Sequence, residues 1–315
     1  MNKHTKGLVL GLFFGVLLLM VAIIGVEILA SVVYEPDSSA VACMEQSGTV
    51  IVRDTEKYIA FVPENTNTGV VLYPNVFVES KAYAPLMREL AQRGILAVVA
   101  KMPMNFAPLN IDAADAICEC YPSVTHWYVA GHSVGGKSAA KYLSEYPDRF
   151  DGLILISAYT DRKLTDLGFR CLSVYGTNDG ILDMDGFTKC LPNLPADCSV
   201  LKIEGGNHSN FGFYGGQWGD NRADITADDQ IEITADGILA FVNGETDISE
   251  ETLKAKQDAD ETTVPETTLP ETAIPETTAP ETTVPETALP ENTAAETTLP
   301  ETTAAQAPSE TAAAA

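Results

Sequence analysis

The chain has 315 residues, and its 44 acidic side chains outnumber its 19 basic ones, which gives a formal net charge of −25. Residues 1–30 carry +1 and residues 261–315 carry −10, so the central part of the chain carries −16. An acidic surface repels the phosphates of nucleic acids, which argues against a nucleic-acid-binding protein, and it disfavours tight binding to anionic lipid headgroups. We interpret the charge as a means of solubility outside the cell.

The first 30 residues are predicted to be a membrane segment. Lys3 and Lys6 precede residues 7–26, a run without any charged side chain. About 20 apolar residues span a bilayer as a helix, and lysines before such a run favour an N-terminus inside the cell. We therefore expect a single-pass signal anchor in the cell membrane, with the rest of the chain outside the cytoplasm. Cleavage after Ala30 would instead give a secreted protein.

The central part alternates between strand-like and helix-like stretches. Residues 31–48 are predicted to be a linker, and residues 49–246 a single domain. Alternation of this kind predicts an α/β fold, a mostly parallel sheet of about eight strands with helices on both faces. The expected strands are 50–52, 58–62, 70–73, 95–100, 127–130, 153–156, 171–175 and 200–203, and the expected helices are 82–93, 111–120, 137–145, 184–190 and 227–243.

Two features of this pattern refine the expected topology. The first two strands are joined by the short polar segment 54–57, so they are expected to pair as an antiparallel hairpin at one edge of the sheet. Only residues 158–170 separate the sixth strand from the seventh, which leaves no room for a lid domain. A site without a lid should be open and should favour small or surface-presented esters.

Ser133 lies in a G-x-S-x-G motif that runs from Gly131 to Gly135, between an apolar strand and a helix-compatible stretch. The glycines permit a turn so sharp that the serine occupies strained backbone space with its hydroxyl exposed. A serine hydroxyl is a weak nucleophile at neutral pH and needs an adjacent base. Ser133 is therefore the candidate nucleophile.

His208 is the candidate base, because it occupies a loop directly after the last predicted strand. The other three histidines are less suitable. His4 precedes the apolar N-terminal run, His126 precedes the strand that leads to Ser133, and His132 lies inside the motif itself. A surface or core-capping role is the alternative for His208.

Asp179 is the candidate carboxylate that orients the base, since it follows the predicted strand at 171–175. Asp183 and Asp185 are competitors, but they are expected to begin the next helix. An ordinary Asp-Gly turn is the alternative for Asp179. The chain order serine, aspartate, histidine differs from the orders of chymotrypsin and subtilisin.

With these motifs the chain resembles the α/β-hydrolase superfamily over roughly residues 50–244. The resemblance rests on residues 131–136 (GHSVGG), 176–180 (GTNDG) and 205–220 (GGNHSNFGFYGGQWGD), and the last run is similar to the signature of a compact, lidless bacterial subfamily of serine hydrolases. It implies Ser133 as the nucleophile, His208 as the base and Asp179 as the acid that orients the base. It does not identify a substrate.

An acyl-transfer site also needs hydrogen-bond donors for the developing oxyanion. One should be the backbone N–H of Val134, the residue after the nucleophile. The second should come from the loop after the strand at 70–73, from the N–H of Asn75 or of Val76. The subfamily often has glycine where this chain has Asn75, and asparagine tolerates left-handed backbone angles better than most residues.

Several neighbouring residues are weaker candidates. Four apolar residues near strand ends could wall an acyl pocket, although such residues are more often core (Tyr73, Phe77, Met102 and Met104). Asp220, close to the base in sequence, could accept hydrogen bonds that position the base loop, or could be a solvated loop carboxylate.

Six cysteines lie in the part of the chain expected outside the cytoplasm, where disulfides are permitted (Cys43, Cys118, Cys120, Cys171, Cys190 and Cys198). A short disulfide between Cys190 and Cys198 is one expectation, and the connectivity as a whole stays open. The sequence has no signature of a metal or an organic cofactor.

Residues 247–315 are predicted to be a disordered tail. From residue 264 to residue 300 they repeat a unit of the type Val-Pro-Glu-Thr-Thr. Proline in each unit blocks helix formation, and the glutamates repel each other, so the tail should be an extended spacer or stalk.

Together these features predict a membrane-tethered, extracytoplasmic serine hydrolase. It is expected to cleave carboxylic esters through an acyl-enzyme, with a small ester or acyl compound as substrate and no cofactor. A thioesterase or an amidase would use the same triad. A non-catalytic surface-binding module with a hydrolase-like body is the alternative from another class, and the oligomeric state is open.

Overall fold

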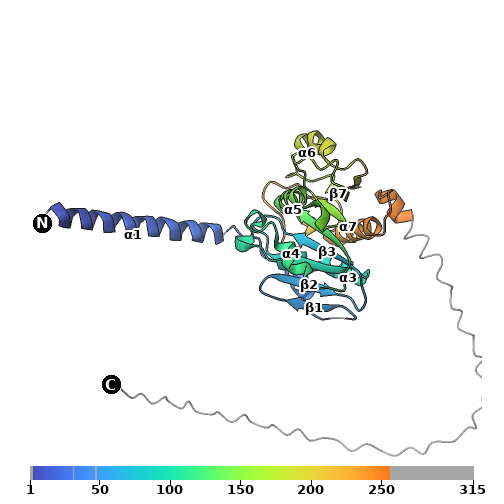
Figure 1. The fold of residues 1–315 in the computed structure, drawn as a ribbon, viewed down its shortest axis with the longest axis horizontal. Coiled ribbons are helices and arrows are strands. Elements are labelled where there is room, and N and C mark those ends of the chain that lie inside the picture. The colour runs from blue at the N-terminus through green and yellow to red at the C-terminus, as the bar shows by residue number, and fades with distance from the viewer. Residues whose placement is uncertain (1–2, 31, 47, 256–315) are drawn as a thin grey trace, which may run out of the picture. The chain divides into compact units, whose positions relative to one another are not determined.

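The core of the protein is a single sheet of eight strands. The computed structural model describes residues 3–30, 32–46 and 48–255, and its sheet has the order β1-β2-β4-β3-β5-β6-β7-β8 (Figure 1). The strands are β1 (Ile51–Asp54), β2 (Tyr58–Val62), β3 (Thr68–Tyr73), β4 (Leu96–Ala100), β5 (His126–His132), β6 (Gly152–Ile156), β7 (Arg170–Gly176) and β8 (Ser199–Ile203). Strands β3 to β8 are parallel, and only β1 and β2 run against their neighbours.

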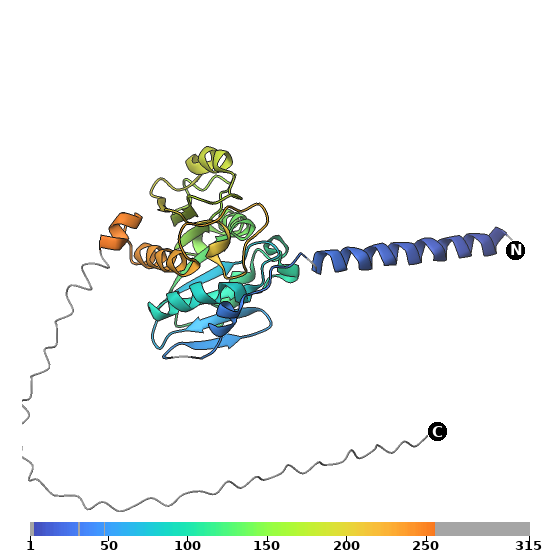
Figure 2. The same cartoon turned by 180° about the vertical axis from the view of Figure 1, so that it is seen from behind.

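Helices cover both faces of this sheet. They are α3 (Ala84–Gln92), α4 (Ala113–Cys118), α5 (Val134–Glu145) and α7 (Ala227–Val242), and the short helix α6 (Met184–Cys190) follows β7. Helices α3 and α7 pack on one face of the sheet, and α4 and α5 pack on the other. The view from behind in Figure 2 brings α3 and α7 to the front. Alternate residues of a strand point to opposite faces, so Val70 and Leu72 of β3 contact the first pair and Val71 contacts the second.

Local sequence explains where these elements begin and end. The inner strands are buried on both faces and therefore read as continuous apolar runs rather than alternating ones. Helix α7 begins at a capping box, in which the Thr226 hydroxyl accepts the Asp229 N–H at 3.1 Å and the Asp229 carboxylate accepts from Thr226. Helix α5 begins at Val134 rather than at residue 137, because the motif's own glycines form its first turn.

The predicted fold class is confirmed in its main part. All eight expected strands are present, with the first two paired as an antiparallel hairpin at the sheet edge. Residues 157–169, between β6 and β7, contain neither a helix nor a strand. The carboxyl ends of the parallel strands meet at one edge, which is where loops in such sheets form binding sites.

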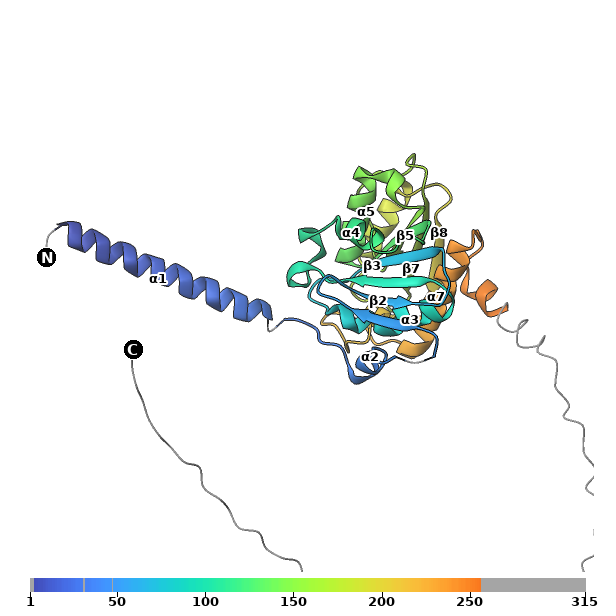
Figure 3. The same cartoon turned by 60° about the horizontal axis from the view of Figure 1, so that its bottom comes forward.

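Residues 32–46, predicted to be a linker, instead pack against the domain. The Tyr34 N–H donates to the Phe77 carbonyl at 2.7 Å, and the Arg88 guanidinium donates to the Cys43 carbonyl. Helix α2 (Ser38–Ala42) lies beside α3, as Figure 3 shows, and buries Ala40 completely. Tyr34, Cys43 and Met44 also pack against the hydrophobic cluster of α3 and α7, so backbone hydrogen bonds and apolar contacts together hold the segment on the domain.

The domain also continues past residue 246, where the tail was predicted to begin. Ile248 and Leu253 are buried in the same hydrophobic cluster as α7, and the Glu250 carboxylate accepts the Glu204 N–H at 2.8 Å. The repeat region of the predicted tail lies outside the described residues.

Residues 3–30, predicted to be a membrane segment, form the helix α1 (Lys3–Ala30). Within residues 3–30, 32–46 and 48–255, no helix combines the length and apolar character that a membrane span requires.

The expected Cys190–Cys198 disulfide is absent, and all six cysteines are free thiols. The Cys198 thiol donates to the Ser199 carbonyl at 3.6 Å. It also lies beside Cys171 on the neighbouring strand, and this contact together with burial raises the pKa of Cys171 well above its usual value. Cys198 is therefore directed into the sheet rather than toward α6.

Candidate active site

Ser133 occupies a strained turn between β5 and α5. Its backbone angles are φ 54° and ψ −114°, a conformation that residues other than glycine rarely adopt. The turn is fixed by the Ser133 N–H, which donates to the Ile156 carbonyl at 2.9 Å. A side chain at Gly135 would collide with the backbone of Tyr73 and Pro74, so this glycine lets α5 approach the loop after β3.

The structure brings His208 and Asp179 together, as the sequence predicts. His208 follows β8 and Asp179 follows β7, and their Nδ1 and Oδ2 atoms are 2.9 Å apart. Both side chains are only 1% exposed. The other carboxylate oxygen of Asp179 accepts the N–H groups of Ile181 and Leu182 at 2.8 and 2.7 Å. These bonds fix the carboxylate in one orientation.

The electrostatics of this pair define its proton arrangement. Burial by itself raises the pKa of Asp179, but hydrogen bonds from His208 and Leu182 and the charge of His208 outweigh burial and lower the pKa below its usual value. An ionised carboxylate only accepts hydrogen bonds, so the proton of neutral His208 lies on Nδ1. The Nε2 atom is left as an acceptor, and it is buried without a partner in the described part of the chain.

Ser133 and His208 line the same small cavity, of about 90 Å³. Val134, Ser157 and Leu182 also line it. As the first residue of α5, Val134 has an N–H without an intrahelical acceptor, which suits it to receive a negative oxygen. Asp183 and Asp185, the competitors of Asp179, belong to the start of α6, where Asp183 caps the helix by accepting the Gly186 N–H.

The loop after β3 holds both of the other expected oxyanion donors in hydrogen bonds. The Asn75 N–H donates to the Tyr83 hydroxyl at 3.0 Å, and the Val76 N–H donates to the Asn75 side-chain oxygen at 2.7 Å. The Asn75 side-chain amide donates to Gln217 at 3.0 Å. Asn75 thus acts as a cap on its own loop, which a glycine at this position could not do.

Tyr83 and His132 form a buried pair that the sequence did not indicate. The Tyr83 hydroxyl is 2.8 Å from His132 Nδ1, and both residues are fully buried. Burial, followed by the neighbouring His208, lowers the pKa of His132 well below its usual value. His132 is therefore neutral, and a hydrogen bond joins its Nδ1 to the Tyr83 hydroxyl, whose oxygen also accepts the Asn75 N–H. The His132 and His208 rings lie 4.5 Å apart.

Asp220 is the hydrogen-bond acceptor of the base loop, as one of its two interpretations predicted. Its carboxylate accepts the N–H groups of Gly180, His208 and Ser209 at 3.1, 3.3 and 2.8 Å, and the Ser209 hydroxyl at 2.6 Å. It therefore connects the loop of His208 to the loop of Asp179.

The candidates for an acyl-pocket wall are placed elsewhere. None of Tyr73, Phe77, Met102 and Met104 lines the Ser133 cavity. Tyr73 is core and donates its hydroxyl proton to the Ile111 carbonyl at 2.7 Å, whereas Met104 is 60% exposed.

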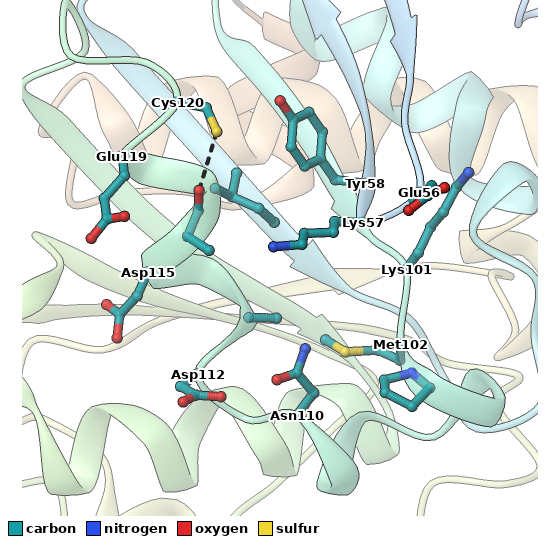
Figure 4. Close-up of a pocket in the computed structure, with 14 residues that line it drawn as sticks. Glu56, Lys57, Tyr58, Lys101, Met102, Asn110, Asp112, Asp115, Glu119 and Cys120 are labelled. Atoms are coloured by element: carbon teal, nitrogen blue, oxygen red, sulfur yellow. Dashed lines mark hydrogen bonds between the residues drawn. The ribbon is translucent and has the colours of Figure 1, made fainter.

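A larger cavity, of about 670 Å³, lies beside the end of β4, and Met102 lines it. Figure 4 shows its mixed lining, in which Lys57 and Lys101 lie across from Asp112 and Asp115 of the α4 region. It contains none of Ser133, Asp179 and His208. Cavity size alone would therefore have selected a site without the predicted nucleophile, base and acid.

Solved structures with similar folds include hydrolases from several microorganisms. Est1E from Butyrivibrio proteoclasticus is 15% identical, with 62% of this chain and 97% of that chain covered and a TM-score of 0.44. A putative dienelactone hydrolase from Klebsiella pneumoniae is 16% identical, with 62% and 100% covered and a TM-score of 0.47. A predicted CIB-like hydrolase from Thermoplasma acidophilum is 15% identical, with 60% and 97% covered and a TM-score of 0.44.

No curated protein matches the chain. The model of the alpha/beta hydrolase family matches residues 69–232, which include the nucleophile turn, the loop of Asp179 and the loop of His208. The chain belongs to the alpha/beta hydrolase family.

Proposed function

We propose that the protein is a serine hydrolase that cleaves carboxylic esters. The observation that carries the proposal is the pairing of His208 with Asp179, which leaves His208 Nε2 without a partner among the described residues, while His208 and Ser133 line the same cavity. An oriented imidazole beside a serine in strained backbone space is the arrangement that activates a hydroxyl.

The reaction follows from the proton arrangement. Ser133 Oγ attacks the ester carbonyl carbon while His208 Nε2 takes the hydroxyl proton, and Asp179 stabilises the imidazolium that forms. The tetrahedral intermediate collapses, the C–O bond to the alcohol breaks, and His208 returns the proton to the leaving oxygen. Water, deprotonated by His208, then hydrolyses the acyl-enzyme and restores the Ser133 hydroxyl.

The negatively charged oxygen of each tetrahedral intermediate needs hydrogen-bond donors. The Val134 N–H supplies the first, and the Val76 N–H supplies the second once the Asn75 side chain releases it. The cavity volume of about 90 Å³ favours a short acyl group.

The location of this chemistry is a proposal that rests on the sequence alone. Lys3 and Lys6 before the uncharged run of residues 7–26 favour a signal anchor at the cell membrane, with the hydrolase domain outside the cytoplasm. Protease accessibility of the domain in intact cells tests this location.

The activity is tested with 4-nitrophenyl acetate and the full-length chain. The Ser133→Ala variant should lose at least about 10⁴-fold in kcat, because the nucleophile acts as a unit with its base. Ser144→Ala is the matched control, since Ser144 lies in the same helix and bonds only the Lys141 carbonyl there. Equal activity of the two variants would refute the proposal. If thioesters or amides were hydrolysed instead of esters, the proposed substrate class would be wrong, but the roles of Ser133, His208 and Asp179 would stand.

A further inference from the structure

A second cavity adjoins the cavity of Ser133. It has a volume of about 390 Å³ and is lined by Lys137, Lys141, Tyr159, Thr160, Asp161 and Arg162. Lys137 and Tyr159 line both cavities, so the two cavities are adjacent and share these two side chains.

The lining of this second cavity is basic in an otherwise acidic protein. It contains three cationic side chains and one carboxylate, whereas residues 31–260 together carry a net charge of −16. Lys137 and Lys141 are four residues apart on α5, so they lie on the same face of that helix. Like charges at this spacing destabilise a helix slightly, which a bound anion would relieve.

In the part of the chain that the structure describes, these cations are not paired with carboxylates. Among the described residues, no ion pair involves Lys137, Lys141 or Arg162. By contrast, Lys101 pairs with Asp54, Arg149 with Asp115 and Lys202 with Glu204. Asp161, the one carboxylate of the lining, forms no ion pair with them among the described residues, so the cavity keeps an excess of two positive charges that an external anion can neutralise.

Lys137 is held between the two cavities. Its ammonium group lies 4.4 Å from the centre of the Tyr159 ring, a cation–π contact that restrains the side chain without neutralising it. The one carboxylate in the Ser133 cavity near this point is Asp183. Its Oδ1 accepts the Gly186 N–H at 3.1 Å and its Oδ2 accepts the Tyr159 hydroxyl at 3.5 Å, so both oxygens have hydrogen-bond donors of their own.

We propose that this second cavity binds an anionic group of the substrate, a carboxylate or a phosphate, while the ester carbonyl lies at Ser133. The inference rests on the proposed esterase function and specifies its substrate class, an ester that carries a negative charge a few bonds from the scissile carbonyl. Local cations are needed for such a substrate, because the acidic surface as a whole repels it.

The test compares chromogenic esters that differ in charge. The neutral reference is 4-nitrophenyl butyrate. The anionic esters are 4-nitrophenyl hemisuccinate, with a carboxylate on the acyl side, the 4-nitrophenyl ester of 3-phosphonopropionate, and 3-carboxy-4-nitrophenyl butyrate, with a carboxylate on the leaving group. At least one anionic ester should have a kcat/KM about tenfold above that of the reference at low ionic strength, and salt should reduce the preference.

Variants connect the preference to the cavity. Lys141→Gln and Arg162→Gln should each lower the ratio of anionic to neutral kcat/KM by about fivefold. Arg53→Gln is the matched control, because it removes one exposed charge from the edge strand β1, which four strands separate from β6, and its ratio should equal that of the wild type. A ratio near one for every anionic ester, or a ratio that both cavity variants leave unchanged, would overturn the inference.

A binding measurement keeps this inference separate from the proposed function. Titration calorimetry with succinate and with inorganic phosphate at low ionic strength should show a Kd that Lys141→Gln and Arg162→Gln each raise by about fivefold, and Arg53→Gln should not raise it. If no ester is turned over but these anions bind as expected, the esterase function fails while the anion site stands. If esters are hydrolysed by Ser133 but neither anion binds, the anion site fails alone.

Discussion

His208 Nδ1 lies 2.9 Å from Asp179 Oδ2, and this bond joins the loops that follow two neighbouring strands, β8 and β7. The pair is nearly inaccessible to water, with both side chains 1% exposed. A charge-assisted hydrogen bond in such surroundings is stronger than one at the surface, so it both orients the imidazole and stabilises the fold. Activity and stability should therefore depend on the same two residues.

Asp179→Asn should lower kcat by about 10³–10⁴-fold, because an amide can stabilise the wrong imidazole tautomer and cannot stabilise an imidazolium. KM should change little. Steady-state hydrolysis of 4-nitrophenyl acetate measures both constants. Asp185→Asn, which alters an exposed carboxylate in the first turn of α6, is the control and should retain wild-type activity.

Stability should depend on pH through Asp179. Its pKa is lowered in the folded protein, so its stabilising contribution is fully present above the unfolded-state value near 3.8 and is lost as pH falls through the folded pKa. The difference in Tm between wild type and Asp179→Asn should thus be constant from pH 7 to pH 5 and shrink below pH 4. A difference that grew toward low pH would show that the carboxylate is destabilising when ionised.

Asn75→Ala should raise kcat by about fivefold. The substitution removes the side-chain oxygen that accepts the Val76 N–H at 2.7 Å, and a hydrogen bond of this kind is worth about 1 kcal/mol. The Val76 N–H can then donate to the oxyanion without first breaking its hydrogen bond to the Asn75 side chain. Pre-steady-state acylation rates isolate the affected step. A loss of about 10²-fold or more would instead assign the Asn75 side chain itself to the oxyanion site.

Tyr83→Phe should reduce the free energy of unfolding by about 1–3 kcal/mol, because it leaves the buried Asn75 N–H and His132 Nδ1 without their partner. It should also lower kcat more than it raises KM, since Tyr83 positions the loop after β3 rather than touching the substrate. Urea unfolding gives the first value and steady-state kinetics the second. The control is Tyr146→Phe at a half-exposed ring, where both values should match the wild type.

The sequence predicts the sheet and the three principal residues of the site because each signal is local. A buried parallel strand reads as an apolar run, and Ser133, Asp179 and His208 each follow such a run within a glycine-containing loop. The strand order then brings the three loops to one edge of the sheet. Nothing beyond element order is needed for this part of the site.

The remaining contacts join residues that have no local signal. Asn75 and Gln217 are 142 positions apart, and Tyr83 reaches His132 across 49. Tyr83 looks like an ordinary aromatic at the start of a helix, and His132 looks like a filler inside the motif. Their roles come from side-chain directions within a packed core, which periodicity does not encode. The segment of α2 was misjudged for a related reason, since backbone bonds and apolar contacts to distant parts of the chain fix it.

The basic cavity illustrates a third kind of signal. In the sequence, Lys137 and Lys141 are ordinary charges in a predicted helix, and Arg162 lies between two predicted strands. Whether they can bind an external anion depends on which carboxylates lie near them, and this is known only from the folded structure. Net charge alone suggested that the protein avoids anions, whereas the local arrangement favours binding one next to the nucleophile.

The central claim is that Ser133 is an activated nucleophile, and the most direct measurement is labelling of the full-length protein with a fluorophosphonate, followed by peptide mapping. We predict one stable adduct, on Ser133, that forms in the wild type and in Asp185→Asn but is lost in His208→Ala. A folded wild-type protein that forms no adduct, or one that reacts equally well without His208, would contradict the account.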